Sequence, residues 1–312
     1  SLETALGAFG KSIFAVGDIA VSQRDVTGGP VTFGFVGERE ISSDRLVGGL
    51  HKIVEAEREL WNTSDFPPHT ILVYGAGDCC WSFGTSMYRS FAGVVAREKP
   101  DEVRETLSQL VAHEYLHQWI PGELGSPKPF DAYAWFTEGV TQYLAHRIKL
   151  EVGVYDFEGY VEEVNEVIEK YWNSPVRDAP RSRVERQFAR NPKVRQLAYY
   201  QGELLALNWN AAIIQATDAK DSLGSALRRL ADNHAADDSF RLGDETLAEA
   251  LHAFAPELDV TGAIEKHIGE GRRIEIREDA LGPCARLVEG SHDEAPQFEL
   301  RETAEGSCTD RF

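Results

Sequence analysis

Two histidines and a glutamate in the segment LVAHEYLHQWIPG (residues 110–122) are placed to do chemistry together. His113 and His117 are four residues apart, and the surrounding pattern predicts a helix over 101–119. Side chains four apart on a helix leave the same face, about 5–6 Å apart, so both imidazoles can bind one metal ion. Glu114 follows the first histidine directly and can contact a water on that metal. The spacing therefore predicts a metal site with a general base beside it.

A third metal ligand is expected in WFTEGVTQYLAHR (135–147), which also has helical periodicity. Glu138 lies in the first turn of this helix, with twenty residues between it and His117. A His₂Glu set leaves the fourth tetrahedral position to water, as in catalytic zinc sites, whereas structural zinc is usually closed by Cys and His. No cysteine lies near enough in sequence for a closed site. The helix dipole alone also favours a glutamate there, but next to HExxH we interpret Glu138 as a ligand.

These segments carry a family resemblance. HEYLHQW followed by WFTEGVTQY resembles the gluzincin metallopeptidases, and most nearly the glycyl aminopeptidases, whose bacterial members often carry a PDZ domain. LAYYQGELLALNWNAAI (197–213) resembles that family's Tyr-Tyr-x-Lys-Gly stretch, and the resemblance covers roughly residues 10–275. It implies an α+β fold: a thermolysin-like metallopeptidase catalytic domain in which a small mixed β-sheet lobe precedes a mostly helical lobe.

The resemblance also implies a mechanism. Zn²⁺ held by His113, His117 and Glu138 would activate a water, and Glu114 would take its proton and pass it to the leaving amine. Zinc is the usual metal for such a set, and Mn²⁺ and Co²⁺ are the alternatives.

A tyrosine is the family's hydrogen-bond donor to the oxyanion of the tetrahedral intermediate. Counting back three residues from Gly202 gives Tyr199, and Tyr200 is the rival if the local register slips. The family's lysine is Gln201 here, which is a departure from the pattern.

The expected anchor for a substrate's free amino group is also missing. In the family it is a glutamate on a strand before the zinc helix, and the matching segment here is GAGDCCWSFGTSMYRS (75–90). The alignment puts Ser82 at the glutamate position, and Asp78, four residues earlier, is a candidate substitute. A basic run after the zinc motif is likewise replaced by IPGE (120–123). Losing a buried carboxylate weakens selection for an ammonium group.

The sequence therefore predicts a zinc peptidase, and the resemblance favours an aminopeptidase. A zinc endopeptidase without the amine anchor is the alternative within the same chemistry. Hydrolysis of another bond, such as an ester or epoxide, and a catalytically silent binding protein are the other readings. The presence of Glu114 argues against a silent protein, because this glutamate is not needed to hold the metal.

The elements that must position these residues run from strands to helices to a short tail. Strands are expected within 12–41, from SIFAVG and VTFGFVG, and at 70–74 and 86–97. Helices are expected at 42–62, 101–119, 137–151, 156–173, 200–217, 222–234, 244–254 and 260–268. We expect residues 1–40 to end a β-rich N-terminal region, 41–270 to form the zinc peptidase domain, and 271–312 to form a strand-and-loop tail. Compared with the family, this order suggests a catalytic core or a reduced member.

Composition limits the partners. The 312 residues are 42% hydrophobic, enough for one large domain or two smaller ones. The formal net charge of −19 repels nucleic acid and anionic membranes. No apolar run approaches the ~20 residues that span a bilayer. We expect a peptide or protein substrate, no nucleic acid and no membrane insertion, and the oligomeric state stays open.

The four cysteines bear on the compartment. Cys79 and Cys80 are adjacent, so a disulfide between them would be strained. Cys284 and Cys308 lie in the tail and could pair to staple it. Such a bridge slightly favours a periplasmic or secreted protein.

Overall fold

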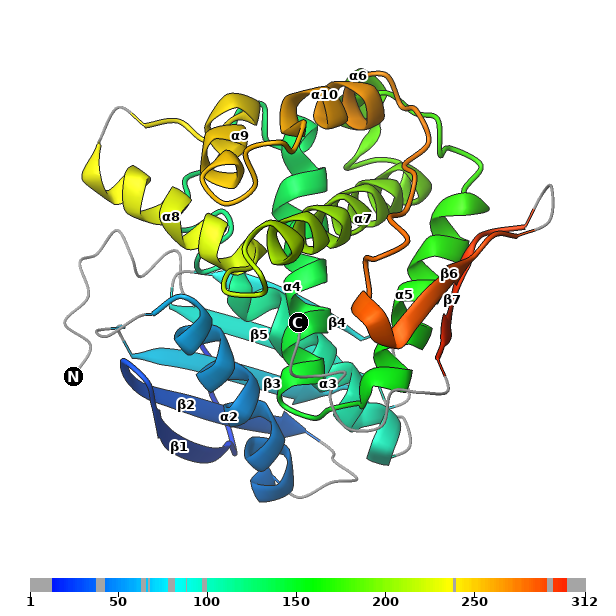
Figure 1. Ribbon diagram of the computed structural model, residues 1–312. Helices are drawn as coiled ribbons and strands as arrows, with labels where there is room; N and C mark the ends of the chain where they lie inside the picture. The colour runs from blue at the N-terminus through cyan, green and yellow to red at the C-terminus, as the bar shows by residue number, and fades with distance from the viewer. Residues whose placement is uncertain are drawn as a thin grey trace. The chain divides into compact units, whose positions relative to one another are not determined.

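The structure is a computed structural model that describes residues 13–37, 43–62, 66, 68–77, 82–87, 89–96, 100–237, 240–290 and 294–301. The chain divides into two compact units (Figure 1). The first is Ser1–Gln118 with Glu151–Val154, and the second is Trp119–Leu150 with Tyr155–Phe312.

The first unit is built on a five-stranded mixed sheet. Its strands are β1 (Ala20–Val26), β2 (Gly29–Gly37), β3 (His69–Gly75), β4 (Phe83–Met87) and β5 (Ser90–Val95). Their order is β1-β2-β3-β5-β4; β2, β3 and β5 run parallel, and the edge strands β1 and β4 run antiparallel to their neighbours. The register places Phe33, Ile71 and Phe91 in one row, and all three are fully buried. The small mixed sheet expected from the sequence is confirmed.

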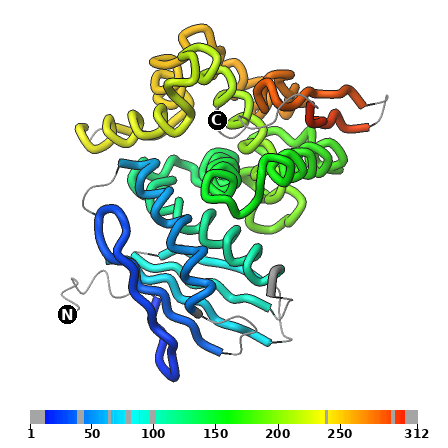
Figure 2. The backbone as a smooth tube through the Cα atoms, turned by 60° about the horizontal axis from the view of Figure 1, so that its bottom comes forward, coloured from blue at the N-terminus to red at the C-terminus, as the bar shows by residue number. Residues whose placement is uncertain are grey.

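Two helices, α2 (Ser43–Leu60) and α3 (Pro100–Leu116), pack side by side against one face of this sheet (Figure 2). Helix α2 buries Leu46, Leu50 and Ile53, whose spacing forms one apolar stripe. Helix α3 contacts β5 and the edge strand β4. The sheet thus holds the helix that carries the HExxH motif.

The second unit is mostly helical, as expected. Its helical elements are η1 (Phe130–Tyr133), η2 (Trp135–Val140), α4 (Thr141–Glu151), α5 (Phe157–Trp172), α6 (Arg181–Gln187), α7 (Pro192–Ala216), α8 (Leu223–Ala236), α9 (Asp244–His252), α10 (Val260–Ile264), η3 (Glu265–Gly269) and η4 (Gly282–Cys284). The long helix α7 packs against η2, α5, α6 and α8. A hairpin of β6 (Ala285–Val288) and β7 (Gln297–Leu300) follows. It is tied to α5 by Asn165, whose amide exchanges two hydrogen bonds with the backbone of Phe298.

Two strand predictions are wrong in detail. The described residues of SIFAVG (12–17) form no strand, and β1 lies at the polar segment that follows them. The strand predicted at 86–97 is instead the end of β4 and all of β5, which pair as a hairpin. The reversal includes Arg89 at φ 53, and an arginine in this left-handed conformation gives no sequence signal of a turn.

One α-helix begins earlier than predicted, and one α-helix was missed. Helix α7 begins at Pro192 rather than at 200, because the Asn191 side chain caps it and proline is tolerated in a first turn. Tyr199 therefore lies inside the helix and not at its start. The short helix α6 had not been predicted.

The domain boundaries predicted from the sequence can be compared with these two units. Strands β1 and β2 share a sheet with β3, so the boundary predicted at residue 40 falls inside the first unit. The boundary predicted at 270 falls inside the second unit. How these segments relate to further domains stays a prediction.

Candidate metal centre and active site

The two histidines of the motif lie together at the end of α3. His113 belongs to the last turn of the helix, and His117 follows its last residue, Leu116. Their ring centroids are 4.8 Å apart, with the ring planes at 89°. His113 is buried and His117 half-buried. The helix therefore brings both imidazoles to one place, as the four-residue spacing predicts.

Glu114, the expected general base, packs against the edge strand β4. An ideal Cβ built on Gly84 would lie 2.9 Å from Cγ of Glu114 and 3.3 Å from Oε1. Gly84 is paired with Gly93 across β4 and β5. The absence of a side chain at Gly84 leaves the space that the Glu114 carboxylate occupies.

The opposite side of the motif is held by a buried arginine. Arg58 of α2 donates from Nε to the hydroxyl of Tyr115, at 2.8 Å, and from Nη1 to the carbonyls of Thr27 and Gly29, at 2.9 and 2.6 Å. Its guanidinium carbon lies 4.6 Å from the Phe66 ring centroid. Burial raises the pKa of Tyr115, which keeps the phenol protonated. Arg58 thereby ties α3 to α2 and to the β1–β2 turn.

Glu138, the expected third ligand, lies in η2, a short π-helix that continues into α4. Its Oε2 accepts a hydrogen bond of 2.6 Å from the hydroxyl of Tyr199 on α7. The backbones of η2 and α7 approach closely, since a Cβ on Gly202 would lie 1.6 Å from the carbonyl oxygen of Trp135. Isolated π-helical turns occur frequently at functional sites. Here the turn sets Glu138 directly beside Tyr199.

The expected ligands form a group that fits zinc. One donor atom each from His113, His117 and Glu138 lies within 4.8 Å of the other two. It is the single group of this kind among the residues that the structure describes. Zinc bonds of about 2.0–2.2 Å bring tetrahedral ligands to about 3.4 Å from one another, so modest side-chain movement closes the set around an ion. The His₂Glu chemistry is that of an open, catalytic site.

Two further residues of α7 were singled out in the sequence: Tyr200, the alternative hydrogen-bond donor, and Gln201, at the position of the family's lysine. Tyr200 is half-buried, and burial raises its pKa, with Lys170 and Glu166 of α5 as charged neighbours. Gln201 is buried and donates to the carbonyl of His267, at 3.3 Å. The geometry thus associates Tyr199, rather than Tyr200, with Glu138. Position 201 packs α7 against η3, so a polar but uncharged residue suits its burial.

The expected amine-binding segment is described only in part. Ser82 accepts a hydrogen bond of 3.1 Å from the backbone N–H of Ala96, so its hydroxyl secures the start of β4. Asp78 lies outside the described residues. Ser86 accepts from the side chain of Gln118, at 2.9 Å, which links β4 to the end of the zinc motif. The role of Ser82 and Asp78 in substrate binding stays a prediction.

Sequence reasoning missed three residues that shape the site: Gly84, Arg58 and Gly202. The glycines carry no chemistry of their own, and the sequence does not show which atoms approach them. Arg58 falls in a helix rich in charged residues, where one buried arginine resembles its exposed neighbours. All three matter because they contact residues that are distant in the sequence.

Comparison with known proteins bears on the expected family and fold. The model of the M61 glycyl aminopeptidase family matches residues 106–205. The fold is similar to that of an aminopeptidase N family protein from Idiomarina loihiensis, with a TM-score of 0.73 and 18% identity over 89% of this chain and 53% of that one. An M1 zinc metallopeptidase from Deinococcus radiodurans, in a mutant form bound to a Tyr-Ser-Ala substrate, gives a TM-score of 0.52 and 12% identity over 83% and 53% of the two chains.

This chain spans about half the length of those two structures. A comparison with curated proteins gave no match. The match of the family model covers both HEYLHQW and WFTEGVTQY, and it ends within the tyrosine-containing helix. The expected resemblance is thus confirmed over residues 106–205, which are similar to the M61 glycyl aminopeptidases, and the fold is similar to that of M1 zinc metallopeptidases.

Proposed function

We propose that this chain is the catalytic part of a zinc-dependent peptidase, and that it acts as an aminopeptidase. The convergence of donor atoms from His113, His117 and Glu138 carries the proposal. The match to an aminopeptidase family over residues 106–205 supports the substrate class. Glu114 beside β4 and Tyr199 beside Glu138 supply the further groups that peptide hydrolysis needs.

The residues divide the chemistry among them. When bound, the zinc ion supplies a Lewis acid and lowers the pKa of a coordinated water. Glu114 accepts a proton from the attacking water and returns it to the leaving amine, which is the work of a general base and then a general acid. The contact of Glu114 with β4 limits its rotamers, so the carboxylate is positioned before substrate binds.

Tyr199 serves as the hydrogen-bond donor. Its hydroxyl already lies at the third ligand, 2.6 Å from Oε2 of Glu138. From that position it orients the ligand in the resting site and can donate to the oxyanion of the tetrahedral intermediate. We assign this role to Tyr199 rather than to Tyr200, whose charged neighbours lie on α5.

The mode of cleavage depends on how a free amino group is recognised. Ser82 carries no charge, and its hydroxyl is engaged by Ala96, so it does not replace a carboxylate. A zinc endopeptidase is therefore the second candidate function. Asp78 is the residue that we propose as the amine anchor if the enzyme is an aminopeptidase.

A matched pair of peptides separates the two modes. Zinc-loaded protein is given one sequence with a free N-terminus and the same sequence acetylated, and products are read by mass spectrometry. We expect stepwise removal of N-terminal residues from the free peptide alone, and loss of that preference in Asp78→Asn. Internal cuts in both peptides would replace the aminopeptidase proposal with the endopeptidase one. No cleavage of several sequences by zinc-bound protein would favour a silent binding protein.

The surroundings of the protein are also proposed. None of the described helices is long and apolar enough to cross a membrane. Cys284 is disulfide-bonded, and disulfides persist mainly in oxidising compartments. We therefore propose a periplasmic or secreted protein that meets peptide or protein substrates.

A further inference from the structure

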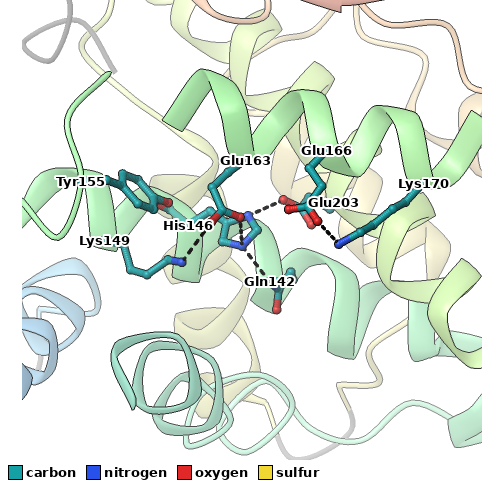
Figure 3. A network of polar contacts seen from close by, with 8 residues as sticks. All are labelled: Gln142, His146, Lys149, Tyr155, Glu163, Glu166, Lys170 and Glu203. Carbon is teal, nitrogen blue, oxygen red and sulfur yellow. Dashed lines mark hydrogen bonds and ion pairs between the residues drawn. The ribbon is translucent and has the colours of Figure 1, made fainter. Parts of the chain in front are cut away.

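A buried polar network joins α4, α5 and α7 in the second unit (Figure 3). At its centre, Nδ1 of His146 lies 2.6 Å from Oε1 of Glu203, joining α4 to α7. Both side chains are almost fully buried, at 4% and 6% exposure. A carboxylate only accepts, so the ring nitrogen donates in this contact.

The remaining members fix the imidazole. Nε2 of His146 lies 2.8 Å from the amide nitrogen of Gln142 and 3.4 Å from Oε2 of Glu163. Lys149 lies 3.9 Å from the other oxygen of Glu163, and the hydroxyl of Tyr155 donates to the carbonyl of His146. The ring is therefore held from α4, α5 and α7 at once.

This network is not a second metal site. Glu203 and Glu163 contact opposite ring nitrogens of His146, so their oxygens do not converge with one nitrogen on a single ion. Within the described part of the chain, the only cluster of His, Cys, Asp or Glu suited to a metal is the one already assigned. The function of the network therefore depends on the helices that it joins.

The network joins the segments that carry Glu138 and Tyr199: η2 with α4, and α7. Glu138 and His146 lie eight residues apart along η2 and α4, while Tyr199 and Glu203 lie four apart along α7. Two hydrogen bonds, Tyr199 to Glu138 and His146 to Glu203, thus link the same pair of segments at successive levels.

The backbones touch between these two links. A Cβ on Gly139 would meet the carbonyl oxygen of Tyr199 at 2.6 Å and Cα of Gly202 at 2.6 Å. The two glycines have no side chains that could interlock. The hydrogen bonds Tyr199–Glu138 and His146–Glu203 therefore resist a small displacement of α4 along α7. A shift of about 1 Å would take the Tyr199 hydroxyl out of hydrogen-bond range of Glu138.

Burying this pair is costly, which argues that it is kept for more than stability. Buried polar pairs are often no better than well-packed apolar residues for stability, but they can impose a single register. We infer that His146 and Glu203 are positioning residues: they lock α4 against α7 so that Tyr199 donates to Glu138 and fixes that carboxylate as a ligand. This inference rests on the proposed zinc peptidase function.

Metal affinity provides a test that is independent of turnover. Zn²⁺ and Co²⁺ affinities are measured by chelator competition, with the visible spectrum of the Co²⁺ form and with kcat and KM for a peptide. Glu203→Ala should weaken metal binding by about 10- to 100-fold, change the Co²⁺ spectrum, and lower kcat more than it raises KM. Glu203→Gln still accepts from Nδ1 of His146 and should restore most of the affinity.

Two further variants make the test decisive. Glu166→Gln removes a neighbouring carboxylate whose partner Lys170 is half-exposed, and it should leave all readouts unchanged. If Glu203→Ala does not fold, the double variant His146→Leu/Glu203→Leu replaces both polar groups with apolar ones and leaves no unpaired charge. It should fold and still bind metal weakly.

The outcomes separate the two proposals. A folded Glu203→Ala or double variant with wild-type metal affinity and Co²⁺ spectrum would overturn the positioning role. Wild-type protein that binds metal but cleaves no peptide would overturn the proposed function. The effect of Glu203→Ala on metal affinity would still be measurable, so the positioning role would be tested separately.

Discussion

At the scale of single residues, the candidate site combines groups that react with groups that make room. His113, Glu114 and His117 are recognisable in the sequence because their chemistry depends on type and spacing. Gly84 matters for a different reason: it leaves the space in which the Glu114 carboxylate lies. The position of Glu114, the proposed general base, therefore depends on a residue without a side chain.

We predict that Gly84→Ala impairs catalysis without removing the metal. The new methyl group would meet Cγ of Glu114 at 2.9 Å and Cε2 of Phe91 at 2.7 Å, so Glu114 must move. We expect kcat to fall by about 10- to 100-fold while zinc stoichiometry stays at wild type. Gly93→Ala, at the paired position, is the matched control, since it presses on Phe91 and Leu110 but not on Glu114. Equal activity of both variants would contradict this account.

Much of the site's chemistry is predictable from the sequence, and its support is not. The ligand set and Tyr199 follow from motifs, and the structure places Tyr199 at Glu138. The contacts of Arg58 with Tyr115, and of His146 with Glu203, each join residues 57 positions apart. No local pattern signals such a pair, because each partner becomes buried only when two helices pack.

At the scale of elements, the approach of η2 to α7 determines where Glu138 lies. The sequence predicts both helices, but it gives neither the π-helical turn nor the early start of α7. A π-turn is a local insertion of one residue into helical spacing, so hydrophobic periodicity does not distinguish it from an α-turn. The strand hairpin of β4 and β5 was missed for a similar reason, since Arg89 adopts a turn conformation without a turn sequence.

Two glycine substitutions should have opposite effects, because Gly202 lies at the contact of η2 with α7 and Gly48 is exposed on α2. Gly202→Ala would place Cβ 1.6 Å from the Trp135 carbonyl oxygen, so the backbones must separate, and we expect a loss of about 3 kcal/mol in unfolding free energy. Gly48→Ala, exposed in α2 with no atom within 4 Å of its new Cβ, should gain about 0.5–1 kcal/mol. Urea unfolding followed by circular dichroism measures both. A Gly202→Ala protein as stable as wild type would show that the close approach is wrong.

At the scale of the whole molecule, stability depends on ionisable groups buried in the first unit. His69 is almost fully buried, and neither ring nitrogen has a hydrogen-bond partner among the described residues. Burial, followed by the charge of Arg58, lowers its pKa to about 3. Glu57 is buried too, and burial raises the pKa of its carboxyl. Glu57 and His69 flank Arg58 of α2 in sequence, and burial disfavours the charged form of both groups.

The His69 shift predicts an acid-sensitive fold. Between pH 6.5 and about 3 the unfolded chain binds a proton at His69 that the folded chain does not, so stability falls as the pH falls through this window. The contribution reaches about 1.4 kcal/mol per pH unit. His69→Phe should lose less stability than wild type between pH 6.5 and 4, measured by urea unfolding at each pH. Parallel curves for the two proteins would mean that His69 is charged in the folded state.

The most direct test of the central claim joins metal content to turnover in three proteins. Wild type, Glu114→Gln and Glu138→Ala are exchanged into zinc buffer, analysed for bound zinc, and assayed on a peptide with a free N-terminus. We predict one tightly bound zinc and cleavage in wild type, one zinc without cleavage in Glu114→Gln, and weakened zinc binding with lost cleavage in Glu138→Ala. If Glu114→Gln cleaves the peptide at the wild-type rate, or if Glu138→Ala binds zinc with wild-type affinity, the account of this site is contradicted.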